Sequence, residues 1–137
     1  MTDFPITVFH NPACGTSRNT VAMIEAAGYR PEVVDYLNTG WTAEQLRGLF
    51  TRMGVGPRAA LRDKGTPAAE LGLLESDVTD EAILSAMVAH PILVNRPIVE
   101  TPKGVALCRP SQRVLDLLER VPDSFVKEDG EIVLGLE

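Results

Sequence analysis

Cysteine is scarce in this chain, because only Cys14 and Cys108 occur among its 137 residues. Two cysteines are too few for a disulfide scaffold. Cys14 also has no second cysteine two or three positions further on, so it belongs neither to a CxxC redox pair nor to a zinc knuckle. We therefore expect no metal site, and each thiol has to be considered by itself.

The chain also lacks an excess of positive charge and a long apolar run. Lysine and arginine together number 13 against 19 acidic residues, and the net charge of −6 argues against nonspecific binding to nucleic acid or anionic lipid. No segment approaches the roughly 20 apolar residues of a membrane span, and the amino end has no basic region typical of a signal peptide. We expect a cytoplasmic protein with neither nucleic-acid nor membrane partners.

What the chain does contain is enough for one folded domain, since 45% of its residues are apolar. The segment ITVF at 6–9 predicts a buried strand, and a helical pattern then runs from Thr16 to Gly28. The segment EVVDYL at 32–37 predicts a second strand. Strand, helix and strand so close together make a βαβ unit, whose two strands should run parallel.

The middle of the chain, 42–90, has a helical pattern throughout. Thr42 with Gln45 has the form of a capping box, and Thr79 before two acidic residues has the form of an N-cap. The predicted helices follow Thr42 and Thr79, with shorter ones at 58–61 and 67–71. This stretch is typical of a helical insertion between two β-containing segments.

Strands return after the insertion, at 92–94, 98–100 and 105–108, and a last helix is predicted from Pro110 to Val121. This order of elements indicates an α/β protein with a thioredoxin/glutaredoxin-like mixed β-sheet and an inserted helical subdomain. We expect a single domain over residues 1–137. Its parts would be a core from 4–40 and 92–121, the insertion at about 42–90, and a C-terminal tail at 122–137.

Cys14 lies where the first predicted strand gives way to a helix. At such a junction backbone N–H groups are unpaired and the helix dipole is positive, which lowers the pKa of a thiol. His10 and Arg18 are close in sequence and add positive potential, while Gly15 and Thr16 can offer amides. Most buried free cysteines are inert, but this setting favours a reactive thiolate.

A thiolate among amides suits an oxyanion substrate. The phosphatase loop C-x5-R is excluded, because the arginine position is occupied by Thr20. An anion would therefore have to be held by arginines from elsewhere, and the candidates are Arg62, Arg96 and Arg109. Arg96 and Arg109 each precede a proline at a strand end, whereas the position of Arg62 gives it the weakest case.

Several segments together resemble one protein family. HNPACGTSRNT at 10–20, HPILVNRPIV at 90–99 and LCRPS at 107–111 closely resemble the glutaredoxin-coupled arsenate reductases. RAALR at 58–62 and KEDGE at 127–131 match as well. The resemblance covers nearly the whole chain in one register.

This resemblance implies arsenic detoxification by reduction of arsenate to arsenite. Cys14 would attack arsenate and form a covalent cysteine–arsenate ester, with His10 helping to keep the thiol ionised. Arg62, Arg96 and Arg109 would hold the oxyanion. Glutathione would act as co-substrate and glutaredoxin would reduce the mixed adduct, and no tightly bound cofactor is implied.

Two alternatives with the same fold stay open at this point. One is a thiol-sensing regulatory protein that binds RNA polymerase, but members of that group commonly carry CxxC, where this chain has Ser17. The other is a monothiol glutaredoxin-like protein, which would not need three arginines.

Two further expectations concern residues near the site. Side chains alternate across a strand, so Cys108 should face away from the side chain of Arg109 and have a structural role. Pro97 should follow a cis peptide bond, because thioredoxin-like folds place a cis-proline opposite the active thiol.

Overall fold

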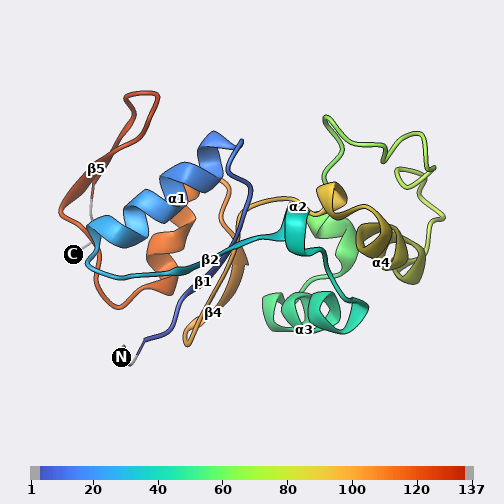
Figure 1. Ribbon diagram of the computed structural model, residues 1–137, viewed down its shortest axis with the longest axis horizontal. Coiled ribbons are helices and arrows are strands. Elements are labelled where there is room, and N and C mark those ends of the chain that lie inside the picture. Colours follow the sequence, from blue (N-terminus) through green and yellow to red (C-terminus); the bar gives the residue numbers. More distant parts are fainter. Residues whose placement is uncertain (1–3, 135–137) are drawn as a thin grey trace. The chain divides into compact units, whose positions relative to one another are not determined.

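The structure, a computed structural model, describes residues 4–134, which belong to two compact units (Figure 1). One unit contains the chain up to Asp35 and again from Arg96 onward, and the other contains Tyr36–Asn95. In sequence, the second unit is inserted between the two halves of the first. Within residues 4–134, no helix is both long and apolar enough to cross a membrane.

The first unit is built on a four-stranded sheet in the order β2-β1-β3-β4. These strands are β1 (Thr7–His10), β2 (Glu32–Asp35), β3 (Ile98–Thr101) and β4 (Gly104–Leu107). The helix α1 (Gly15–Ala26) connects β1 to β2, and these two strands run parallel, whereas β3 is antiparallel to both β1 and β4. The predicted βαβ unit and mixed sheet are confirmed.

The core of the first unit lies between this sheet and two helices, α1 and the 3₁₀ helix η3 (Ser111–Leu117), which is orange beside α1 in Figure 1. Val8 and Val99 are opposite each other in register and belong to one apolar cluster with Met23 and Ile24 of α1. All four residues are 0% exposed. Because burial of each such side chain contributes about 1.5–3 kcal/mol, the apolar face of α1 is what holds this helix against the sheet.

The last helix differs from its prediction, because η3 is a 3₁₀ helix and ends at Leu117, before Val121. Backbone groups that would form the next hydrogen bonds of an α-helix are instead hydrogen-bonded to side chains from other parts of the unit. The Thr101 hydroxyl donates to the Leu117 carbonyl at 2.8 Å, and the Tyr29 hydroxyl accepts from the Arg120 N–H at 2.9 Å. Long-range hydrogen bonds therefore stop a helix that the apolar spacing alone would extend.

The segment expected as a C-terminal tail contains a two-stranded antiparallel sheet. Its strands are β5 (Ser124–Val126) and β6 (Ile132–Leu134). Phe125 and Val133 are partners across this hairpin and pack against the core of the first unit. This packing ties the carboxyl end of the described chain to the unit that contains Cys14.

The second unit is helical. Its elements are α2 (Tyr36–Thr39), α3 (Ala43–Met53), η1 (Pro57–Ala60), α4 (Asp80–Ala89) and η2 (Pro91–Leu93). The hydroxyl groups of Thr42 and Thr79 accept from the N–H groups of Gln45 and Ala82, each at 3.1 Å, at the starts of α3 and α4. Both predicted N-caps are confirmed, and η1 corresponds to the short helix predicted at 58–61.

At the borders of this unit one predicted strand ends earlier than expected and another is wrong. The strand predicted at 32–37 ends at Asp35, because Tyr36 begins α2 and its hydroxyl donates to the Val94 carbonyl at 2.8 Å. The strand predicted at 92–94 is largely the 3₁₀ helix η2, since Pro91 suits the first position of a helix and its carbonyl accepts from the Val94 N–H at 3.0 Å.

The short helix predicted at 67–71 is also wrong, because this segment consists of turns. The Leu71 N–H donates to the Pro67 carbonyl at 2.9 Å, which closes one helix-like turn. Gly72 then adopts a positive φ of 73°, a conformation that leaves the right-handed helical region. The turn therefore does not continue into a helix.

Candidate active site around Cys14

Cys14 is the N-cap residue of α1, after the short loop that follows β1. Its backbone is extended, with φ −101° and ψ 122°, and the residue is 7% exposed. The Asn11 side chain accepts from the Ala13 N–H at 2.9 Å, and the Asn11 carbonyl accepts from the Cys14 N–H at 3.0 Å. The loop thus folds back on Asn11 and places the thiol where helix N–H groups have no partner within the helix.

The pKa of the Cys14 thiol lies below its ordinary value, although burial by itself raises it. Burial is outweighed by a hydrogen bond from the Ser17 N–H, the positive charge of Arg96, a hydrogen bond from the Arg109 side chain, and a further hydrogen bond from the Thr16 N–H. Each of these groups favours the charged form of the thiol. The start of α1 and the two arginines therefore lower the pKa of a nearly buried thiol, in the direction that the helix-start position of Cys14 predicts.

The register of the sheet explains why Arg96 and Arg109 lie at one end of the first unit. Because β3 is antiparallel to both neighbours, Ile98 is opposite Phe9 in β1 and opposite Leu107 in β4. The residues just before β3 and just after β4 therefore lie at the end of the sheet where β1 finishes and the loop to α1 begins. Strand pairing therefore brings two arginines that are far apart in sequence to the end of the sheet near Cys14.

Arg109 makes the contact with the thiol. Its Nη1 lies 3.7 Å from Cys14 Sγ and donates to the Arg96 carbonyl at 3.0 Å. The peptide bonds that follow Arg96 and Arg109 are both cis. The cis bond before Pro97 was predicted, whereas the one before Pro110 was not.

His10 ends β1 and is the register partner of Asp35 in β2. Burial lowers the pKa of its imidazole, Asp35 opposes that shift, and the charge of Arg18 adds to the lowering. A lowered pKa leaves the ring neutral at neutral pH. Support of the thiolate by His10 stays a prediction, and at neutral pH it would have to come from an uncharged ring.

Arg62 belongs to the second unit, directly after η1. Its N–H donates to the Leu93 carbonyl at 2.7 Å, and its Nε donates to the Lys64 carbonyl at 3.1 Å. These bonds hold its backbone and orient its side chain within that unit. Its convergence with Arg96 and Arg109 on one anion stays a prediction.

Cys108 is also a buried free thiol, but its pKa is shifted in the opposite direction from that of Cys14. It is 0% exposed, belongs to the apolar cluster of the first unit, and has a pKa raised by burial to about 12. A thiol with that pKa is protonated at neutral pH and is a poor nucleophile. This burial is consistent with the structural role expected for Cys108.

Three residues at the site were missed or misjudged by sequence reasoning. Ser17, fully buried, supplies an amide to the thiolate, and its hydroxyl accepts from the Asn11 N–H at 3.4 Å. Arg18, noted only for its charge, forms an ion pair with Glu128 at 2.8 Å. Glu128 lies in the segment KEDGE, whose resemblance to the family does not indicate a contact partner. A separation of 110 residues left no local pattern that could have paired them.

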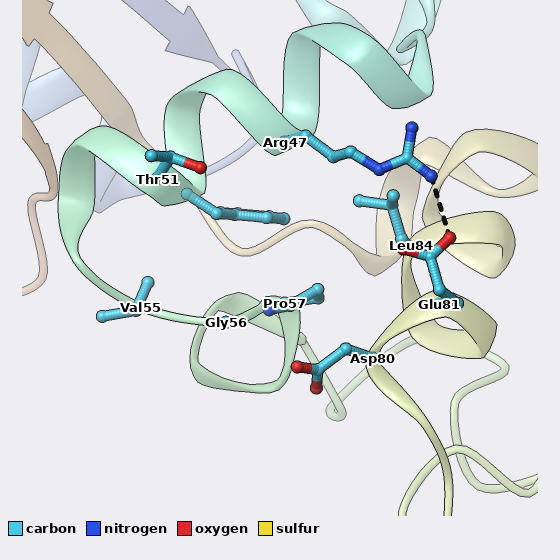
Figure 2. Close-up of a pocket in the computed structure, with 9 residues that line it drawn as sticks. Arg47, Thr51, Val55, Gly56, Pro57, Asp80, Glu81 and Leu84 are labelled. Carbon is cyan, nitrogen blue, oxygen red and sulfur yellow. Dashed lines mark hydrogen bonds and ion pairs between the residues drawn. The ribbon is translucent and has the colours of Figure 1, made fainter.

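A separate pocket of about 280 Å³ lies within the second unit, between α3 and α4. Figure 2 shows Arg47 reaching across it to Glu81, and this ion pair measures 2.8 Å. Phe50 and Leu84 supply apolar lining, and Asp80 adds a second carboxylate. The other lining residues are Thr51, Val55, Gly56 and Pro57, and none of the nine is a candidate catalytic or anion-binding residue.

The fold and the position of Cys14 identify the structural class of the protein. A mixed sheet, a cysteine at the start of the first helix and a cis-proline before β3 are features of a thioredoxin-like protein. Comparison with solved structures agrees with this class. An arsenate reductase from Vibrio cholerae is similar with a TM-score of 0.81 and 36% identity, over 85% of this chain and 100% of that chain.

The chain belongs to the ArsC family, whose profile matches residues 9–117. It is 60% identical to the arsenate reductase ArsI1 of Synechocystis sp., over 98% of this chain and 94% of that protein. It is 50% identical to the arsenate reductase of Escherichia coli strain K12, over 94% of this chain and 92% of that protein. The predicted family and the thioredoxin-like α/β fold are thereby confirmed.

Proposed function

We propose that the chain is an arsenate reductase, an oxidoreductase that forms a covalent intermediate on Cys14 and takes its electrons from glutathione and glutaredoxin. The observation that carries this proposal is a nearly buried thiol with a lowered pKa, in contact with Arg109 and in the field of Arg96. Relatives at 60% and 50% identity that are named arsenate reductases support the choice of substrate.

Arg96 and Arg109 would reduce the electrostatic repulsion between the two reactants. Arsenate and the thiolate are both anions, and like charges about 4 Å apart repel by roughly 4 kcal/mol at an effective dielectric constant of about 20. Guanidinium groups offset this repulsion, because their planar fork donates paired hydrogen bonds to the oxygens of a tetrahedral anion. Arg96 and Arg109 supply that charge from the first unit, and Arg62 would add a third guanidinium.

The covalent step forms a sulfur–arsenic bond. The Cys14 thiolate attacks arsenic(V), and an oxygen of arsenate leaves with protons as water. A glutathione thiol then displaces a second oxygen as water, so that arsenic(V) carries both sulfurs. The thiolate of glutaredoxin attacks the glutathione sulfur, and the electron pair of the broken sulfur–arsenic bond stays on arsenic, which becomes arsenic(III). Water then releases arsenite from Cys14.

The placement of the two cysteines supports an external resolving thiol. Cys108 lies in the apolar core with a pKa of about 12, so it is a poor candidate for attack on an adduct at Cys14. Electrons must then arrive on another molecule, which is the role proposed for glutathione and glutaredoxin. Such thiol chemistry needs a reducing compartment, and this supports a cytoplasmic location.

The test is arsenate-dependent oxidation of NADPH in a coupled assay that contains glutathione, glutaredoxin and glutathione reductase. The wild-type chain should oxidise NADPH only when arsenate is present. Cys14→Ser should abolish this activity, while Cys108→Ser, the matched control, should keep most of it. Equal loss in both variants would contradict an external resolving thiol. Turnover of a glutathionylated substrate without any response to arsenate would instead favour a glutaredoxin-like protein.

A further inference from the structure

Each of the three nitrogens of the Arg18 guanidinium donates a hydrogen bond, although 44% of the side chain is exposed. Its Nε and Nη2 donate to the two carboxylate oxygens of Glu128 at 2.8 Å and 2.9 Å. Its Nη1 donates to the Pro12 carbonyl at 2.8 Å. Arg18 therefore bridges the C-terminal hairpin and the loop that leads into Cys14.

Glu128 makes a second contact with α1, the helix that contains Arg18. Its backbone N–H donates to the Asn19 side-chain oxygen at 3.0 Å. A Cβ added at Gly15 would lie 3.6 Å from both Arg18 Nη2 and Glu128 Oε1, so the ion pair packs directly over the first residue of α1. The hairpin thus contacts the helical turn whose Thr16 and Ser17 amides donate to the thiolate.

We propose that Glu128 is a positioning residue for the nucleophile: through Arg18 it fixes the Pro12–Cys14 loop against the first turn of α1. The bidentate geometry supports this role, since a carboxylate fork holds a guanidinium in one orientation and not merely nearby. The part of the inference that concerns catalysis rests on the proposed function. The part that concerns thiol reactivity does not.

Loss of Glu128 has two effects on the thiol that act in opposite directions. Without its partner, the full charge of Arg18 would favour the thiolate and lower the pKa of Cys14. A loosened loop would weaken the amide hydrogen bonds to the thiolate and raise that pKa. The side chains of Arg18 and Glu128 are 44% and 49% exposed, so solvent screens the charge effect. The positioning effect should therefore dominate, and the pKa should rise.

The decisive variants are Glu128→Ala and Glu131→Ala. Both remove one negative charge from the same hairpin, but Glu131 pairs with Lys127 of the hairpin itself at 3.1 Å, whereas Glu128 pairs with Arg18 of α1. Glu128→Gln keeps the shape and one acceptor oxygen of the side chain. Arg18→Ala, alone and combined with Glu128→Ala, completes a double-mutant cycle.

The readout is the rate of iodoacetamide alkylation of Cys14 against pH, with kcat/KM for arsenate measured beside it. Glu128→Ala should raise the alkylation midpoint and slow alkylation at neutral pH about threefold or more. Glu128→Gln should lie between this variant and the wild type, and Glu131→Ala should match the wild type. In the Arg18→Ala background, loss of Glu128 should change little further.

Three results would overturn the inference: equal curves for Glu128→Ala and Glu131→Ala, a lowered midpoint, or additive effects of the Arg18 and Glu128 substitutions. Alkylation does not involve arsenate, so the two proposals fail separately. A wild-type chain that does not reduce arsenate but shows the alkylation shift would refute the proposed function and keep the positioning role.

Discussion

Replacing Arg109 by alanine removes the side chain whose Nη1 lies 3.7 Å from Cys14 Sγ. A hydrogen bond to a charged group contributes about 1.5–3 kcal/mol. The contribution of Arg109 should lie at the lower end of this range, because the contact is long and the residue is exposed. At about 1.4 kcal/mol for each factor of ten, kcat/KM for arsenate should fall about tenfold. The midpoint of Cys14 alkylation should rise at the same time, because this bond favours the thiolate.

The assay needs two comparisons to isolate the guanidinium. Arg109→Lys keeps the charge but loses the planar fork, so its kcat/KM should lie between the wild type and Arg109→Ala. Arg30→Ala removes an exposed arginine from the same unit and should leave both measurements unchanged. A change in kcat/KM smaller than about twofold for Arg109→Ala, with an unmoved alkylation midpoint, would refute the role of this contact.

Three further predictions concern pH, the second unit and the core. The alkylation rate of Cys14 should rise with pH, and its midpoint should lie below the pKa of about 8.5 of a free cysteine. The reason is that the reactive thiolate forms above the lowered pKa and is lost as the pH falls through it. A midpoint at or above the value of a free cysteine would contradict this. Arg62→Ala should lower kcat/KM for arsenate about tenfold with an unchanged melting temperature, and an unaffected kcat/KM would remove it from the anion site. Ile24→Ala should cost about 2–5 kcal/mol of unfolding free energy in urea, whereas Val33→Ala, at a residue 45% exposed, should cost far less.

Predictions from the sequence were correct for features that depend on residues close together in the chain. The N-caps at Thr42 and Thr79 depend on a hydroxyl and an N–H three residues apart, and both are present. The position of Cys14 at a helix start likewise follows from the change from strand to helix pattern around it. The lowered pKa of this thiol could be predicted because the amides that cause much of it lie within three residues.

Predictions failed where a distant partner competes with a local preference. Apolar spacing predicted a helix to Val121, but Thr101 and Tyr29 bind the backbone at and beyond the end of η3. The apolar run at 92–94 predicted a strand, but the preceding proline and the hydroxyl of Tyr36 favour a 3₁₀ turn there. Propensity is a weak preference, and tertiary hydrogen bonds readily override it.

By itself the sequence determined the class of fold and the position of Cys14 at a helix start, because strand and helix periods and helix caps involve neighbours within a few residues. Only the tertiary structure decided which groups meet at that thiol. Arg96 and Arg109 come together because antiparallel pairing aligns Ile98 with Leu107. Glu128 reaches Arg18 across 110 residues because the C-terminal hairpin folds back onto α1. Such contacts depend on strand register and on the return path of the chain, and neither leaves a periodic signal in the sequence.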